Sequence, residues 1–306
     1  MIKYKNLHET LRIKNQEFKF LRKRVYDDIS IYQGKDTYLR IGNPELIEKE
    51  LELHRKFFSH GCPIPEILDE GKLGRQRFYI ESSAGDMLLT YVFSEDFKKI
   101  GKISDHNFSI FLKLTEQFAE AQLSTMTSKR QNEDFYHGIY MNYILDDYPN
   151  LKDNLSKAFE KIKQSVSVFP VVLTHGDLSP HNSLRGGIID FGYAFNGYAG
   201  YDLVGNVFHT YFFPKSNGYE KTRSYEFTEK QFGIYFQAMD VIYSKNGLPH
   251  LSEYLEDFLL AKAIWSSARI TNDLKIKKWR FDLLEQITTD YLEKESIIET
   301  VKKFPS

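Results

Sequence analysis

The sequence predicts an α+β fold of two lobes: a β-rich lobe over residues 1–81 and a mainly helical lobe over residues 87–306, joined by a hinge at residues 82–86. Short aromatic and β-branched runs, which are typical of strands, fill the first part. Apolar residues recur at helical spacing beyond it, and the small residues 82–85 separate the two patterns. Because 306 residues exceed the size at which one core usually stops growing, one large domain and two lobes sharing a cleft are both reasonable.

Strands are expected in the first lobe at residues 18–21, 29–32 and 37–41, where β-branched and aromatic side chains gather. Residues 33–36 read as the turn of a hairpin between the last two, since Gly34 gives the backbone freedom that a tight turn needs.

One helix is expected over residues 45–58, because Pro44 suits a helix start and apolar residues follow at helical spacing. Strands resume at residues 65–68 and 77–80, around a polar turn at residues 71–74.

The second lobe is expected to be mainly helical. Its amphipathic patterns predict helices over residues 104–124, 133–147, 151–166, 229–245, 250–272 and 277–302. Two short apolar runs, at residues 169–174 and 187–192, interrupt them and read as strands on either side of a polar loop. The aromatic residues Phe208, Tyr211 and Phe212 fit a buried core better than a ligand cage.

The composition narrows the class of partner. The 41 basic and 42 acidic residues give no large field of one sign, so we expect no nucleic-acid partner. No run approaches the ~20 apolar residues of a membrane helix, so no membrane partner is expected, and no protein partner is implied. The N-terminus does not read as a signal peptide, and the single cysteine, Cys62, suits a reducing compartment, which predicts a cytoplasmic location.

The polar loop carries the chemistry. Asp177 and Asn182 stand five residues apart after an apolar run, and Asp190 follows the second run eight residues later. Phosphoryl transfer needs one group to accept a proton from the attacking hydroxyl and oxygen ligands for Mg²⁺. Two carboxylates and one amide supply that set if the loop brings them together.

The segments around Asp177 and Asp190, at residues 175–182 and 188–192, resemble the catalytic and metal-binding segments of aminoglycoside phosphotransferases, which are related in fold to choline kinases and protein kinases. The resemblance implies a protein-kinase-like fold, ATP or GTP as phosphate donor, Mg²⁺ as cofactor and a small-molecule hydroxyl as acceptor. It also implies Asp177 as catalytic base, Asn182 and Asp190 as Mg²⁺ ligands, and His175 as a residue that orients the loop without carrying a proton.

On the nucleotide side, the resemblance places Arg40 where these kinases usually carry a lysine that contacts the nucleotide phosphates. Arginine is a plausible replacement, because it is always charged and offers forked donors to phosphate oxygens. Glu50 looks like the ion-pair partner of Arg40, with Glu48 and Glu52 as alternatives.

Residues Ile80, Glu81 and Ser82 resemble the hinge whose backbone groups pair with the adenine edge. Asp202 resembles an acidic residue that follows the metal-binding segment, and we expect it to brace the catalytic loop.

Two features depart from the family pattern. No glycine precedes Gly34 in the first lobe, so no glycine-rich phosphate loop can be assigned, and the basic run at residues 22–24 is typical of a solvated turn. Only seven residues separate Asn182 from Asp190, which requires a tight hairpin whose glycines, Gly186 and Gly187, tolerate positive φ.

Two other functions compete with a kinase. A metal-dependent hydrolase would use His175, Asp177, His181 and Asp190 around Zn²⁺ or Mn²⁺. A nucleotide-binding module without turnover would explain Arg40 and the missing glycines. No Gly-x-Ser-x-Gly or Walker-type loop is present, so the sequence does not favour a serine hydrolase or a P-loop enzyme.

The resemblance leaves the acceptor open among antibiotics such as aminoglycosides, choline, amino-acid alcohols such as homoserine, and sugars. His181 is either a substrate contact or an exposed loop residue. The acidic residues of the predicted helix at 250–272 suit a cationic acceptor or a solvated helix face equally well; they are Glu253, Glu256 and Asp257.

Overall fold

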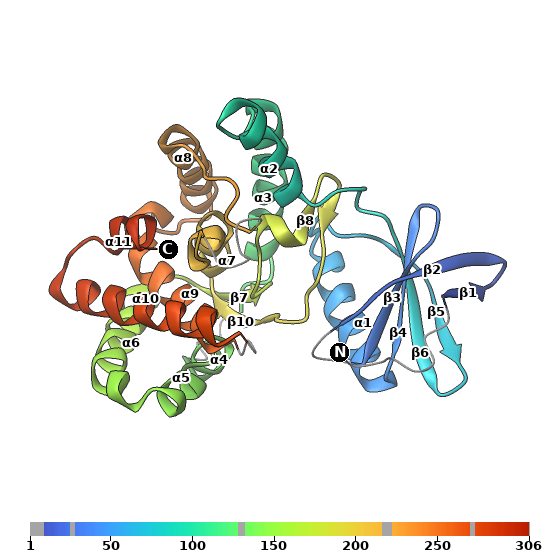
Figure 1. Cartoon of the computed structure of the whole chain (residues 1–306), viewed down its shortest axis with the longest axis horizontal. Helices are drawn as coiled ribbons and strands as arrows, with labels where there is room; N and C mark the ends of the chain where they lie inside the picture. Colours follow the sequence, from blue (N-terminus) through green and yellow to red (C-terminus); the bar gives the residue numbers. More distant parts are fainter. Residues whose placement is uncertain (1–8, 25–27, 128–131, 216–221, 270–272, 306) are drawn as a thin grey trace.

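The computed structural model describes residues 9–24, 28–127, 132–215, 222–269 and 273–305. A curled antiparallel sheet with one helix forms the first lobe, and a larger, mainly helical lobe follows it (Figure 1). The predicted two-lobed α+β fold is confirmed. The chain passes from one lobe to the other between β6, which ends at Ser82, and α2, which begins at Leu89.

Six antiparallel strands make the sheet of the first lobe, in the order β1-β2-β3-β4-β6-β5. They are β1 (Thr10–Ile13), β2 (Gln16–Lys23), β3 (Ile29–Gln33), β4 (Thr37–Gly42), β5 (Ile67–Leu73) and β6 (Gln76–Ser82). The strands predicted at residues 18–21, 29–32, 37–41 and 77–80 are found, together with the unpredicted β1, and the amide of Gly34 donates to the Thr37 carbonyl at 2.8 Å to close the predicted β3–β4 hairpin. The strand predicted at residues 65–68 begins later, at Ile67, and continues to Leu73, so the turn predicted at residues 71–74 is wrong and lies at residues 74–75.

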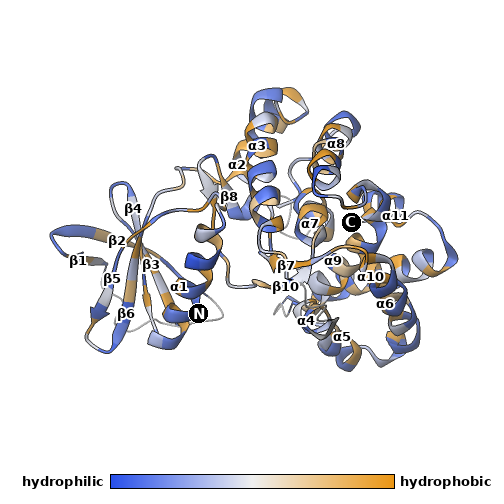
Figure 2. Ribbon diagram, turned by 180° about the vertical axis from the view of Figure 1, so that it is seen from behind, coloured by the Kyte–Doolittle hydropathy of each residue, from blue (hydrophilic) through white to orange (hydrophobic). Residues whose placement is uncertain are grey.

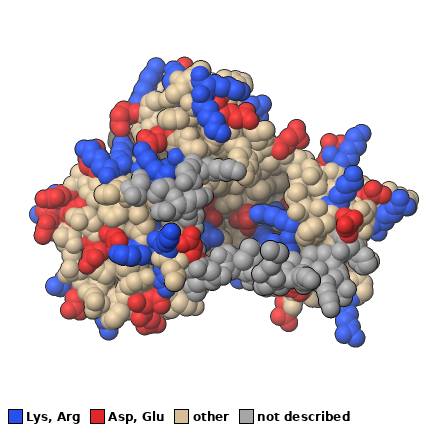
Figure 3. Space-filling view, in the orientation of Figure 1, with Lys and Arg blue, Asp and Glu red and all other residues tan. Residues whose placement is uncertain are grey.

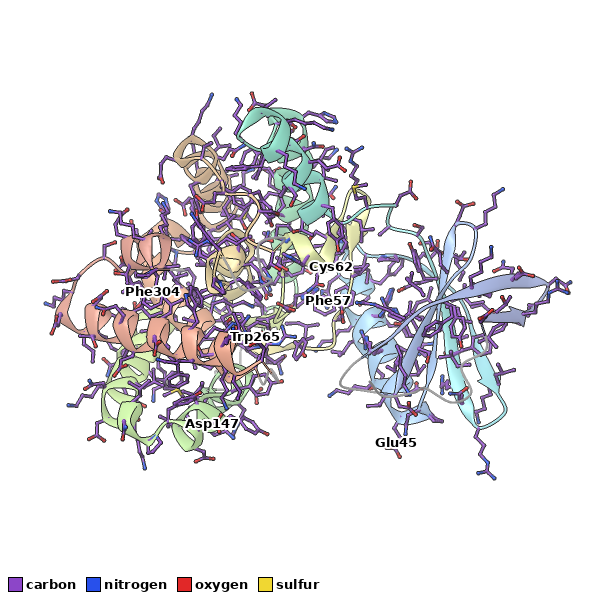
Figure 4. The ribbon with its side chains drawn as sticks, viewed as in Figure 1. Glu45, Phe57, Cys62, Asp147, Trp265 and Phe304 are labelled. Atoms are coloured by element: carbon purple, nitrogen blue, oxygen red, sulfur yellow. The ribbon has the colours of Figure 1, made fainter. Side chains whose placement is uncertain are left out.

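Helix α1 (Pro44–Ser59) packs against this sheet and also reaches the second lobe. The Asn43 side chain caps it by accepting from the Glu45 amide at 2.9 Å. Ile47 and Leu51 contact the sheet, whereas Phe57, near the other end, stacks at 4.7 Å between ring centroids on Phe191 of the second lobe. Figure 4 labels Phe57 and Cys62 at this junction. The helix therefore belongs to the cores of both lobes.

The second lobe consists of helices around a small β-region. The helices are α2 (Leu89–Ile100), α3 (Asp105–Leu123), α4 (Asn132–Gly138), α5 (Met141–Asp147), α6 (Lys152–Val166), α7 (Tyr201–Phe208), α8 (Glu229–Lys245), α9 (Leu255–Ala268), α10 (Leu274–Glu293) and α11 (Ile297–Lys303). The apolar residues of α7 and α9 lie inside the lobe (Figure 2). The aromatic residues expected in the core are buried there: Phe208, Tyr211 and Phe212.

Several predicted helix boundaries are wrong. The span 133–147 is two helices, α4 and α5, because Tyr140 between them takes a left-handed conformation with φ 60°. The span 277–302 likewise breaks at Lys294, with φ 64°. The span 250–272 begins with a 3₁₀ turn, its α-helix ends at Ala268, and its last three residues lie outside the described ranges. Helices α2 and α7 were not predicted.

The polar loop lies between two small sheets. Strand β7 (Val171–Thr174) pairs with β10 (Phe195–Tyr198), and β8 (Ser183–Leu184) pairs with β9 (Gly187–Ile188). Both apolar runs that flank the loop contain strands, and each of these strands pairs with a different partner rather than with the other run. The partner of β7 is a strand whose sequence, Phe195 to Tyr198, carries little strand signal.

No helix in the described part of the chain is long and apolar enough to cross a membrane.

Replacing Phe57 by alanine should lower the free energy of unfolding by about 3–5 kcal/mol, because it empties a fully buried aromatic site shared by the two lobes. Its neighbour Phe58 is 50% exposed, so Phe58→Ala should change the same quantity by no more than about 0.5 kcal/mol. Urea titration of both variants measures the difference. Equal losses would show that Phe57 does not hold the junction.

Candidate active site

The loop after β7 is shaped by one glycine. Gly176 has φ +80°, and a Cβ added there would lie 2.1 Å from the Tyr193 carbonyl oxygen. Only glycine fits both the backbone conformation and the space. The loop carries Asp177, whose side chain is 12% exposed.

Asp202 at the start of α7 braces the loop from beneath, as predicted. Its fully buried carboxylate accepts hydrogen bonds from the amides of His175 at 2.7 Å and Gly176 at 2.9 Å, and from the Gln122 side chain at 2.7 Å. Burial raises the pKa of Asp202, while these donors and Lys262 act in the opposite direction. The carboxylate thereby fixes the backbone from which Asp177 projects.

His175 links the loop to the segment that precedes Asp190. Its Nε2 donates to the Ile189 carbonyl at 3.0 Å, and its Nδ1 accepts from the Asp177 amide at 3.3 Å. Both ring nitrogens are engaged inside the protein. These contacts suit an orienting residue and leave no nitrogen to carry a proton to or from a substrate.

The structure brings Asp177, Asn182 and Asp190 together. Asn182 donates from Nδ2 to the Asp177 carbonyl at 2.8 Å, and its own carbonyl accepts from the Ile189 amide at 2.9 Å. Asp190 has φ +70°, an uncommon conformation for a residue other than glycine. Such conformations cluster at functional sites, where the surrounding structure holds them.

The hairpin between the two expected metal ligands is tight, as predicted, but for a different reason. Gly186 and Gly187 both have negative or extended backbone angles rather than positive φ. Gly186 is needed because its amide donates to the Ala84 carbonyl at 2.8 Å, and a Cβ there would lie 2.8 Å from the same oxygen. The hairpin thus contacts the hinge at residues 82–86 directly.

The donor set fits a hard cation such as Mg²⁺. Burial acts to raise the pKa of Asp190, but Arg24 and Arg40 outweigh it and hold that pKa below its usual range. Asp190 is therefore ionised at neutral pH, and with the amide oxygen of Asn182 it offers the oxygen ligands that Mg²⁺ prefers.

A zinc-type site is not assembled. No group of three or more His, Cys, Asp or Glu side chains in the described ranges could hold a metal ion. His175 uses both nitrogens internally. His181 is half-buried rather than exposed, burial lowers its pKa to about 4, and its Nε2 contacts Thr90 at 3.3 Å. The described residues therefore do not form the metal site that a Zn²⁺- or Mn²⁺-dependent hydrolase would need.

The ion pair expected between Arg40 and Glu50 is not formed. Arg40 on β4 donates instead to Glu81 on β6 at 2.8 Å, with side chains 7% and 5% exposed. The register explains the choice: Arg40 lies opposite Tyr79, and Glu81 is the next residue of β6 on the same face. The alternatives do not pair with Arg40 either, since Glu48 contacts Arg77 and Glu52 is exposed.

The hinge expected to pair with adenine is partly used by the protein itself. Ile80 lies in the core of the sheet. The amide of Ser82 donates to the Glu66 carbonyl at 2.9 Å, and that of Ser83 donates to the Asp36 carbonyl at 3.0 Å. Adenine contacts at Ile80, Glu81 and Ser82 stay a prediction, and the Ser82 amide already has a partner within the protein.

Arg24, read from sequence as part of a solvated turn, is largely buried and contacts the candidate site. It follows β2, and its guanidinium contacts Glu50 through Nη1 and Asp190 through Nη2, the latter at 2.6 Å. Only 11% of its side chain is exposed, against 57% for Arg22. Figure 3 shows acidic and basic side chains at the floor of the hollow between the lobes.

A second cation, Arg269, contacts Asp177. It follows α9 and donates from Nη1 to Asp177 Oδ2 at 3.0 Å and from Nη2 to the Tyr193 hydroxyl at 3.0 Å. Its guanidinium lies over the rings of Tyr193 and Trp265, 4.2 and 4.6 Å from their centroids. The other carboxylate oxygen, Asp177 Oδ1, is buried and has no partner among the described residues.

Lys262 lies beneath the same loop. Its Nζ donates to the Gly176 carbonyl at 2.7 Å and lies 3.7 Å from the ring centroid of Trp265, which Figure 4 labels at the centre of the molecule. Burial lowers the pKa of Lys262 to about 8. Lys262 and Trp265 lie three residues apart on one face of α9, and Arg269 stands four residues after Trp265, just beyond the end of the helix. That pattern was readable in the sequence, although it does not point to Asp177.

A family model matches the part of the chain that contains the candidate site. Residues 114–224, which include the loop and Asp190, match the model of the phosphotransferase enzyme family. The chain resembles these phosphotransferases. A search of curated proteins finds no match.

Solved structures with the same fold include aminoglycoside phosphotransferases and a choline/ethanolamine kinase family protein, the two groups that the sequence motifs resemble. A choline/ethanolamine kinase family protein from Mesorhizobium loti is 13% identical, with a TM-score of 0.54 over 90% of this chain and 91% of that one. A thermostable aminoglycoside phosphotransferase mutant, in a ternary complex with AMP-PNP and hygromycin B, is 15% identical, with a TM-score of 0.52 over 89% and 93%. An aminoglycoside phosphotransferase from Streptomyces rimosus is 12% identical, with a TM-score of 0.50 over 81% and 92%.

Replacing Arg40 alone by methionine should lower the free energy of unfolding by about 3–5 kcal/mol, because it leaves the buried Glu81 carboxylate unpaired. The double variant Arg40→Met, Glu81→Leu should recover most of that loss, since no buried charge remains. Urea unfolding of the two proteins measures both values. A double variant as unstable as the single one would mean that the pair does more than neutralise Glu81.

Proposed function

We propose that this protein is a small-molecule kinase that transfers the terminal phosphoryl group of ATP or GTP to a hydroxyl group. The main support is the loop that holds Asp177 beside Asn182 and ties both to the segment ending at Asp190. The family match over residues 114–224 and the shared fold support a phosphotransferase. The proposed nucleotide site lies between a lobe at residues 1–81 and one at residues 87–306, around a hinge at 82–86.

In the proposed reaction, Asp177 accepts the proton of the acceptor hydroxyl. The hydroxyl oxygen forms a bond to the γ-phosphorus, the bond from that phosphorus to the bridging oxygen of the β-phosphate breaks, and the nucleoside diphosphate leaves. Because the transition state of such transfers is loose, positioning contributes more than base strength. His175 and Asp202 provide that positioning by fixing the loop.

Asn182 and Asp190 are the proposed ligands of Mg²⁺. The ion, when bound, would neutralise charge on the phosphates. The ionised state of Asp190 and the tether between Asn182 and Ile189 support this assignment.

The charge beside Asp177 bears on the acceptor. Arg269 contacts the proposed base, and Lys262 lies beneath its loop. A polycationic aminoglycoside or a choline cation would meet these positive charges. We therefore propose an acceptor with an anionic group, such as a carboxylate, near its hydroxyl, and homoserine is an acceptor of this kind.

The acidic residues of the α9 region do not offset this positive charge. Asp257 accepts hydrogen bonds from Ser165 and Tyr291, and Glu256 from Ser296, so both hold neighbouring helices. Asp257 is about 17 Å from Ala268, the last residue of α9, at a rise of about 1.5 Å per residue, and Arg269 follows Ala268. Asp257 in the first turn of α9 and Arg269 just beyond its last residue therefore lie at opposite ends of the helix.

The first experiment is nucleotide consumption by the purified protein with Mg²⁺ and ATP or GTP, across aminoglycosides, macrolides, choline, homoserine, hydroxy acids and sugars. We expect turnover with an anionic acceptor, and Asp177→Asn should slow it by roughly 10²- to 10⁴-fold while leaving nucleotide affinity intact, because only the proton acceptor is lost.

Near-normal turnover by Asp177→Asn would contradict the base assignment. Turnover with aminoglycosides alone would contradict the anionic acceptor and leave the kinase reaction standing. Nucleotide binding without turnover on any acceptor would favour the binding module instead.

Asp190→Ala should remove the dependence of nucleotide affinity on Mg²⁺, because a proposed ligand is lost. Titration of a fluorescent ATP analogue with Mg²⁺ and with EDTA measures the difference. Asp282→Ala, which removes an exposed carboxylate on α10, is the control and should keep the Mg²⁺ effect. An unchanged Mg²⁺ effect in Asp190→Ala would exclude Asp190 from the metal site.

A further inference from the structure

Arg24 joins three separate parts of the molecule. It comes from the end of the β2 strand, Glu50 comes from α1, and Asp190 follows the β8–β9 hairpin. One guanidinium contacts both carboxylates, with 2.6 Å between Nη2 and Asp190 Oδ1. The side chains of Arg24 and Glu50 are only 11% and 13% exposed. A charged group so placed is held by specific partners rather than by solvent.

The backbone of Arg24 is anchored, so the side chain reaches this position from a fixed base. Its amide donates to the Ile29 carbonyl at 3.0 Å, which extends the pairing of β2 with β3 by one residue. Glu50 is anchored as well, because its second oxygen accepts from the Tyr79 hydroxyl at 3.0 Å. The Arg24–Glu50 pair is therefore a preorganised element of the first lobe.

Arg40, which the sequence resemblance placed at the nucleotide phosphates, already forms an ion pair with Glu81. Its Nε donates to Glu81 at 2.8 Å, and both side chains are almost completely buried within the sheet. Any movement of Arg40 toward a nucleotide that breaks this Nε contact would leave the Glu81 carboxylate buried without its partner, which is costly. Arg24, by contrast, contacts Asp190, the residue proposed to face the nucleotide phosphates.

We propose that Arg24 is the first-lobe residue that binds the nucleotide phosphates, in place of Arg40. This inference rests on the proposed kinase function. Glu50 holds Nη1, and Nη2, which contacts Asp190 in the structure, turns to a phosphate oxygen when nucleotide binds. A planar guanidinium suits this exchange because its forked donors serve a carboxylate and a phosphate at once.

The proposal also accounts for the absence of glycine before Gly34. A glycine-rich loop binds phosphates through closely approaching backbone amides. Here the connection between β2 and β3 begins with an arginine whose side chain reaches Glu50 and Asp190. The side chain would supply donors that such a backbone would otherwise supply.

The test is direct binding of ADP and of a non-hydrolysable ATP analogue, with Mg²⁺, by isothermal titration calorimetry. Arg24→Ala should weaken the affinity for the ATP analogue by about 10- to 100-fold, the usual cost of a lost charged hydrogen bond, and Arg24→Lys should fall between it and the wild type. Lys19→Ala, which removes an exposed cation from the same strand, should stay within about two-fold. Thermal unfolding of each variant verifies that it is folded. If Arg24→Ala does not fold, the nucleotide affinity of Arg24→Lys tests the proposal.

The outcomes separate the inference from the proposed function. If the wild type binds nucleotide and Arg24→Ala and Arg24→Lys bind it equally well, Arg24 is not the phosphate residue. If Arg24→Ala binds more tightly, Arg24 occludes the site instead, which also overturns the inference. If the wild type binds neither nucleotide, the kinase function itself fails.

Discussion

The buried carboxylate of Asp202 is the interaction on which the site depends. It accepts from two consecutive amides at the start of the catalytic loop and from Gln122, so a charge with no access to water organises a stretch of backbone. A buried carboxylate is tolerable only when donors surround it, and each donor is in turn held in place by the charge. The left-handed turn at Gly176 and the projection of Asp177 follow from this arrangement.

Ion pairs also organise the candidate site, where each carboxylate with a proposed catalytic or metal-binding role has an arginine partner. Arg269 contacts Asp177 and Arg24 contacts Asp190, and these arginines come from different lobes. The two acidic groups thus share a small region without strong mutual repulsion. Ligands of the site would have to displace or rearrange these contacts, so the arginines set which charges can enter.

The sequence predicted what short-range patterns encode. The β3–β4 hairpin, α1 and the catalytic motif each depend on residues close together in the chain, and they are found. It did not predict Arg24, because its partners Glu50 and Asp190 lie 26 and 166 positions away and no local period reports such pairs. Helix α7 was missed because all eight of its residues are buried, which removes the alternation that marks a surface helix.

The shared position of α1 constrains how the lobes can move. Its first half packs on the sheet through Ile47 and Leu51, while Phe57 near its end lies in the core of the other lobe against Phe191. Sliding of one lobe past the other would break one of these contacts. A rotation of the first lobe about an axis close to Phe57 would preserve both. Opening and closing of the cleft should therefore be a swing of the sheet about the end of α1, with the largest displacement at the tip formed by β1 and β2.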